Sequence, residues 1–116
     1  MAKIIAALLL TATLAAGDSG INTRVYPQAI LRGNSIWLTC RVSPDKRNRT
    51  LRYGVVNSEQ ENTERQLDGS DAKITWGPVE IKRVGCDAGP AYCQVLRADG
   101  SHSEDIRPIN VGGCEP

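Results

Sequence analysis

The sequence has no phenylalanine, one histidine and one methionine, and its aromatic residues are two tryptophans and three tyrosines. A core must therefore be built mainly from Val, Ile, Leu and Ala. The sequence also has no marked excess of either charge: 14 Lys and Arg residues against 13 Asp and Glu residues leave a net charge of +1. This balance gives no electrostatic footprint for nucleic acid, which we do not expect as a partner. The carboxyl end has no hydrophobic tail, so no membrane span is expected in the mature chain.

What is present points to one small globular domain. The chain has 116 residues, of which 41% are hydrophobic and 23% are charged. This length allows one ordinary core, and the composition is neither that of a disordered polyelectrolyte nor that of a multi-span membrane protein.

The amino terminus has the layout of a secretory signal. Lys3 precedes the apolar run Ile4–Leu10, and the chain turns polar at Asp18. The alternative is a retained anchor or a buried first helix, but the run is short for a bilayer and small residues supply cleavage sites. We expect a signal peptide at residues 1–17 and a mature domain at 18–116, secreted to the extracellular space, or to the periplasm in a bacterium.

Four cysteines suit that oxidising compartment. They are Cys40, Cys86, Cys93 and Cys114, an even number that predicts two disulfides in one of three pairings. No CxxC pair is present and His102 is the only histidine, so we expect no zinc site and no cofactor.

The mature chain is predicted to be all-β with about seven short strands. Ser35–Val42 alternates most clearly, with Trp37 on the face opposite Cys40. Residues 57–71 are mostly polar and predict a loop or a weak edge ribbon, and Asp99-Gly100 marks a hairpin. The other strands are expected at Val25–Leu31, Thr50–Val56, 72–76, Val79–Val84, Ala91–Arg97 and Ile106–Val111, with a break at Gly77-Pro78 between two of them.

Two segments resemble immunoglobulin domains. Gly33–Cys40 is similar to the second strand of that family, and Val79–Val84 followed by Asp87–Cys93 is similar to its fifth strand, corner and sixth strand. The chain resembles a divergent member, because the third strand has no tryptophan and Tyr53 or Leu51 must fill that volume. The resemblance implies an antiparallel β-sandwich in which Cys40 pairs with Cys93 across the core. Cys86 and Cys114 are then left to pair at one end of the sandwich.

No catalytic arrangement emerges from the residues. His102 sits in the predicted hairpin tip beside Ser101 and Glu104, and neighbours on a loop tip do not orient a base against a nucleophile. We therefore expect no catalytic residues and do not expect the protein to be an enzyme. Asp68–Asp71 is interpreted as a turn because it lacks the ligand count of a calcium loop. Asn48 begins a sequon that would carry a glycan in a cell that glycosylates.

Two surfaces are candidates for binding. Trp37 points away from the predicted core face, and Trp76 in a neighbouring strand is a candidate to share that outer face. The alternative is that Trp37 is covered by the polar segment 57–71 or by Trp76. The other candidate is the loop end at residues 43–49 and 98–105, which has mixed charge. Its candidate residues are Lys46, Arg47, Arg49, Asp99, His102 and Glu104.

The sequence thus predicts a secreted, non-catalytic immunoglobulin-like module that binds a protein or a surface glycan. The alternative is a small secreted inhibitor or effector that docks on an enzyme or receptor. An enzymatic function requires a pocket that holds His102 against a carboxylate.

Overall fold

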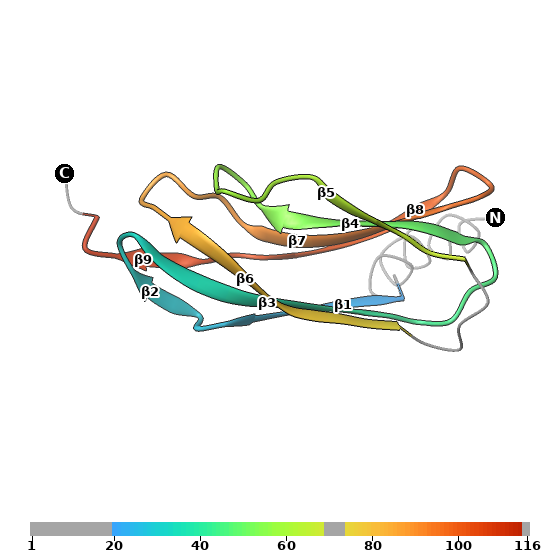
Figure 1. Ribbon diagram of the computed structural model, residues 1–116, viewed down its shortest axis with the longest axis horizontal. Helices are drawn as coiled ribbons and strands as arrows, with labels where there is room; N and C mark the ends of the chain where they lie inside the picture. Colours follow the sequence, from blue (N-terminus) through green and yellow to red (C-terminus); the bar gives the residue numbers. More distant parts are fainter. Residues whose placement is uncertain (1–19, 69–73, 115–116) are drawn as a thin grey trace, which may run out of the picture.

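The computed structural model describes residues 20–68 and 74–114, so the predicted signal peptide lies outside the described residues. All regular structure within them is β-strand, as predicted, and Figure 1 shows the strands in two layers. In chain order the strands are β1 (Ile21–Tyr26), β2 (Ala29–Leu31), β3 (Asn34–Val42), β4 (Asn48–Val55), β5 (Thr63–Gln66), β6 (Ile74–Val84), β7 (Ala91–Arg97), β8 (His102–Arg107) and β9 (Asn110–Gly112).

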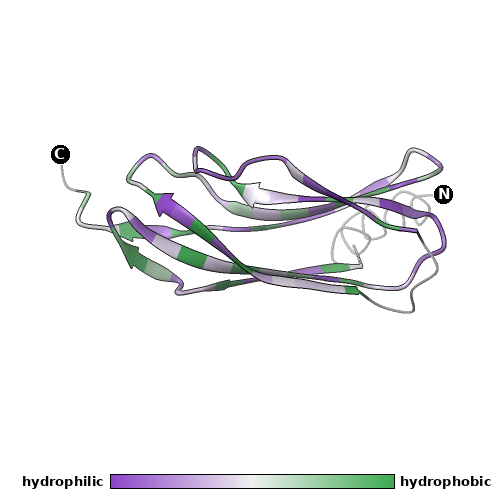
Figure 2. Cartoon of the chain, viewed as in Figure 1, coloured by the Kyte–Doolittle hydropathy of each residue, from purple (hydrophilic) through white to green (hydrophobic). Residues whose placement is uncertain are grey.

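One layer is an antiparallel sheet with the strand order β1-β3-β6. Burial along β3 follows the period of two that the sequence predicts: Ile36, Leu38 and Cys40 are buried, and Trp37 between them is exposed. Figure 2 shows this alternation of hydropathy along β3. The sheet therefore has an inner face toward the other layer and an outer face toward solvent.

The second layer is an antiparallel sheet with the order β5-β4-β7-β8. Strand β7 has the predicted bounds. Within the described part of the polar segment, residues 57–68, the one strand is the four-residue edge strand β5. The Asp99-Gly100 hairpin is confirmed: Gly100 has φ +90° between β7 and β8, a backbone conformation that glycine adopts at low cost.

Proline interrupts the first predicted strand, Val25–Leu31. Strand β1 ends at Tyr26, and after Pro27 the chain leaves β3 and continues as β2, which pairs in parallel with β9. Pro27 cannot donate the N–H that would continue the ladder. The antiparallel prediction therefore holds for the two main sheets but not for this short pair.

The predicted break at Gly77-Pro78 is wrong, because β6 runs through it. The register between β3 and β6 shifts there, so an extra residue is accommodated as a bulge. Gly77 has φ +109°, and a Cβ at this position would collide with the carbonyl oxygen of Leu38. Glycine thus allows the strand to continue.

The core lies between the layers and is built mainly of Val, Ile and Leu, as the composition predicts. Its largest fully buried side chains are Val25, Ile36, Leu38, Val42, Leu51, Val55, Ile81, Val84 and Val95. The Cys40–Cys93 disulfide crosses this core from β3 to β7, and Cys86–Cys114 ties the β6–β7 corner to the chain after β9. Both predicted disulfides are confirmed.

Hydrogen bonds also join the layers along one side, between β1 and β8. The backbone N–H of Thr23 donates to Asp105 Oδ2 at 2.8 Å, and Arg107 Nε donates to the Thr23 carbonyl at 3.2 Å. Asp105 thereby caps the free edge of β1, which would otherwise present an unpaired N–H.

Candidate functional site

The outer face of β1-β3-β6 carries an exposed aromatic pair. Tyr26 and Trp37 are direct partners in the register of β1 and β3, and they are 58% and 46% exposed. Directly opposite residues on one face of a sheet have Cβ atoms about 5 Å apart. The two side chains are therefore exposed neighbours on one face of a hydrogen-bonded sheet. Exposed aromatic area of this kind is characteristic of binding surfaces.

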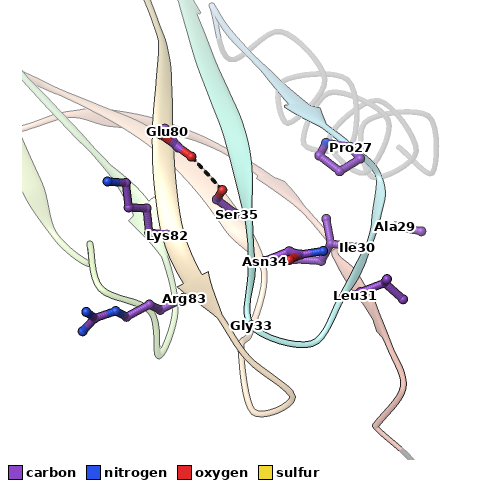
Figure 3. Close-up of a pocket in the computed structure, with 10 residues that line it drawn as sticks. All are labelled: Pro27, Ala29, Ile30, Leu31, Gly33, Asn34, Ser35, Glu80, Lys82 and Arg83. Carbon is purple, nitrogen blue, oxygen red and sulfur yellow. Dashed lines mark hydrogen bonds between the residues drawn. The ribbon is translucent and has the colours of Figure 1, made fainter.

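A groove adjoins the aromatic pair. Glu80 lies directly opposite Trp37 on β6, and Ser35 Oγ donates to Glu80 Oε2 at 2.8 Å, as Figure 3 shows. The groove has a volume of about 550 Å³, within the range of small-ligand sites. Its walls include Pro27, Leu31, Ser35, Glu80, Lys82 and Arg83.

Three cations surround the aromatic pair. Arg24 on β1, Arg41 on β3 and Lys82 on β6 are exposed. Among the residues that the structure describes, none forms a hydrogen bond or an ion pair with the charged group of these side chains. We call the surface formed by Arg24, Tyr26, Trp37, Arg41 and Lys82 the basic aromatic face.

The outer face of the second layer has the opposite character. Arg52 on β4 is held by Glu64 at 2.7 Å, while Glu104 on β8 is exposed beside Gln94. A cavity of about 340 Å³ opens here and includes Glu61 and Glu104 in its lining. This face therefore carries more carboxylates than cations.

Tyr92 fixes the loop beside this cavity. Its hydroxyl accepts a hydrogen bond from the Asn62 backbone N–H at 2.6 Å and donates to Asn62 Oδ1 at 3.1 Å. Burial raises the pKa of the phenol, so it remains a neutral donor.

His102 does not lie in the hairpin tip, where the sequence analysis expected it. It is the first residue of β8 and pairs with Leu96 on the outer face of the second layer. The strand begins this early because residues 98–101 are enough to turn the chain.

The predicted loop end does form, but its charges bind one another. Arg47 contacts Asp45 at 2.8 Å and Asp99 at 2.6 Å, and Arg97 lies 3.4 Å from Asp45. The hydrogen bond from the Arg47 side chain is the main cause that lowers the pKa of Asp45 from 3.8 to about 2. Hydrogen bonds from Ser101 are the main cause that holds the pKa of Asp99 well below its usual range. These residues stabilise the two loops against each other.

The side chains of two further residues in the 43–49 segment donate hydrogen bonds to backbone carbonyl oxygens. Arg49 donates to the carbonyl oxygens of Lys46 and Asn48 at 2.7 and 2.9 Å. Asn48 is only 3% exposed, and its Nδ2 donates to the Ser43 carbonyl at 3.2 Å. In the folded chain, the nitrogen that a glycan on the sequon would use therefore belongs to a buried side chain and is engaged in a hydrogen bond.

Trp76 does not share a face with Trp37. It pairs with Cys40, which faces the core, and its ring lies 6.0 Å from that of Tyr53. The Arg65 guanidinium lies 4.2 Å from the centre of the Trp76 ring. Counting back from Glu80 with a period of two places Trp76 on the outer face, but the extra residue of the bulge turns it inward.

The sequence analysis did not name Tyr26, Arg24, Arg41 or Lys82 as candidate binding residues. Strand β1 begins at Ile21, four residues before the predicted start, so the predicted strand does not include the full alternation of buried Ile21, Thr23 and Val25. That alternation places Arg24 and Tyr26 on the outer face and was readable in the sequence.

Within residues 20–68 and 74–114, no group of three or more His, Cys, Asp or Glu side chains is arranged to hold a metal ion. Nor does that part of the chain contain a helix with the length and apolar character to cross a membrane. Comparison with protein family models, curated proteins and solved structures finds no match for this chain.

Proposed function

We propose that this protein is a secreted, non-catalytic recognition module with an immunoglobulin-like fold, and that it binds a protein or a surface glycan through the basic aromatic face. The observation that carries the proposal is the exposed pair Tyr26 and Trp37, held side by side on a regular sheet. Tyr, Trp and Arg are the residues that contribute most to binding at protein surfaces. Because the sheet fixes the two backbones, little conformational entropy is lost when a partner covers the rings.

The immunoglobulin-like assignment is supported by the strand arrangement. Strands β1, β3 and β6 form one layer and β4, β7 and β8 belong to the other, with a disulfide from β3 to β7. In the immunoglobulin fold the second and sixth strands carry this inter-sheet disulfide. Trp76 and Tyr53 beside the disulfide fill the volume for which the family uses a tryptophan of the third strand.

Secretion is supported by the covalent structure. All four cysteines form disulfides, which fits an extracellular or another oxidising compartment. The loop end supports an inhibitor or effector less well, because Arg47 and Asp99 bind each other and are not free for a partner.

The proposal is tested with the disulfide-bonded protein on a glycan array and on a panel of extracellular proteins. Trp37→Ala is compared with Ile106→Ala, which removes a similarly exposed apolar side chain (49%) from the opposite layer. We expect binding that Trp37→Ala weakens by at least about tenfold and Ile106→Ala leaves intact. Equal binding by the two variants, or a loss confined to Ile106→Ala, contradicts the proposal.

A further inference from the structure

The two outer faces of the protein carry opposite charge. In β1, β3 and β6, Glu80 is the one acidic residue, and it accepts the hydrogen bond from Ser35. Arg24, Arg41 and Lys82 outnumber it. The opposite layer exposes carboxylates, and its Arg52 is already paired. A net charge near zero therefore conceals a basic surface on one side.

The cations lie along the sheet on both sides of the aromatic pair. Arg41 is four residues from Trp37 along β3, which corresponds to about 13 Å of strand. Lys82 is two residues beyond Glu80, the partner of Trp37, and so lies about 7 Å away in the other direction. From Arg41 through the aromatic pair to Lys82, the surface extends over about 20 Å. A ligand that contacts all of it must be an extended polymer of several units, because one small molecule is too short.

We propose that the basic aromatic face binds an acidic polysaccharide, a chain of sugars that bears carboxylate or sulfate groups. This inference rests on the proposed function and names its ligand class. Tyr26 and Trp37 pack against the apolar faces of sugar rings. Arg24, Arg41 and Lys82 pair with the acidic groups, for which the planar guanidinium offers two parallel hydrogen bonds.

The positive charge of Arg24, Arg41 and Lys82 distinguishes this ligand from a neutral one. A neutral glycan covers the rings, and its hydroxyls can accept hydrogen bonds, but it offers the three cations no opposite charge. Glu80 and Ser35 in the adjoining groove are suited to sugar hydroxyls, since a carboxylate accepts and a serine hydroxyl both donates and accepts. A nucleic acid also offers negative charge, but the disulfides fit an oxidising compartment, in which glycans are the abundant polyanions.

Binding is measured on immobilised heparin, which carries sulfate and carboxylate, and on polygalacturonate, which carries carboxylate alone. Dextran is the neutral control, and a single-stranded DNA oligonucleotide is the competing polyanion. We expect binding to at least one acidic polysaccharide and none to dextran. The affinity should fall by about tenfold or more between roughly 50 and 500 mM salt, because exposed charges are screened.

Matched charge variants locate the site. Arg24→Gln with Arg41→Gln, and separately Trp37→Ala, should each weaken binding by about tenfold. Lys46→Gln with Arg49→Gln removes the same charge from the loop end and should change binding by less than about twofold. Far-UV circular dichroism verifies that each variant is folded.

The opposing outcomes are distinct. An equal loss in the loop-end variant, or tighter binding to DNA than to either polysaccharide, overturns the inference. Self-association of the free protein that Trp37→Ala abolishes also overturns it, because a second copy then covers the face. Trp37-dependent binding of only a neutral glycan or a protein overturns the ligand class but keeps the proposed function. If no Trp37-dependent partner is found, both fail.

Discussion

The two tryptophans should respond very differently to truncation, and this contrast tests the assignment of the two faces. Trp76 packs on Tyr53 beside the Cys40–Cys93 disulfide and lies under Arg65. Replacing a buried tryptophan by alanine costs about 3–5 kcal/mol. Because Trp76 is half-buried on the edge strand β6, we expect about 3 kcal/mol for Trp76→Ala. That corresponds to a fall in Tm of roughly 12–24 °C for a domain of this size.

Trp37→Ala should cost about 1 kcal/mol or less, because that side chain is 46% exposed and loses mainly cross-strand contacts on the outer face of the sheet. Trp76→Phe is the control for ring volume. It keeps most of the packing and removes Nε1, which is buried without a hydrogen-bond partner. Its cost should stay below about 1.5 kcal/mol.

The assay is urea unfolding of the oxidised protein, followed by far-UV circular dichroism because the variants change the fluorescence. A common m-value converts the midpoints to free energies. The reasoning is refuted if Trp37→Ala lowers the midpoint as much as Trp76→Ala does. It is also refuted if Trp76→Ala leaves the midpoint unchanged, since Trp76 then contributes nothing to the core.

Three further predictions concern stability. Asp45 has a folded pKa of about 2 against an ordinary 3.8, so its interactions with arginine stabilise the fold above about pH 4, and that contribution is lost as the pH falls toward 2. In a plot of the urea midpoint against pH, Asp45→Asn should reduce the fall in the midpoint between about pH 4 and pH 2. Removing Cys86 and Cys114 together opens a link across 28 residues and should cost about 3.5 kcal/mol in urea unfolding. Tyr92→Phe leaves the Asn62 N–H without its acceptor, which should cost about 1–2 kcal/mol and accelerate hydrogen exchange at that amide.

Much of the fold could be predicted because the decisive signals are local. The period of two in β3 and β7 follows from single-face burial. The cysteine pairing is not a local signal: it could be predicted only from the resemblance, in which the second and sixth strands carry the inter-sheet disulfide. Asp99-Gly100 predicts the hairpin because glycine adopts positive φ readily.

The remaining differences arise where one residue alters the register. The bulge at Gly77 reverses the face of Trp76 but leaves the composition of the strand unchanged, so periodicity alone could not place that ring. Whether Arg47 binds a partner or Asp99 depends on two loops that are about 50 residues apart in sequence. The basic aromatic face is likewise a product of pairing, since Tyr26 and Trp37 become neighbours only through the register of β1 and β3.

The most direct test of the account is to locate the bound ligand on the surface. The ¹⁵N-labelled protein is titrated with a heparin oligosaccharide, and the Trp37 indole N–H and the backbone amides are followed by NMR. The account predicts that the largest shift changes occur at that indole and along β1, β3 and β6, and that added salt reverses them. Changes confined to residues 43–49 and 98–101, or spread along β7 and β8, would contradict it.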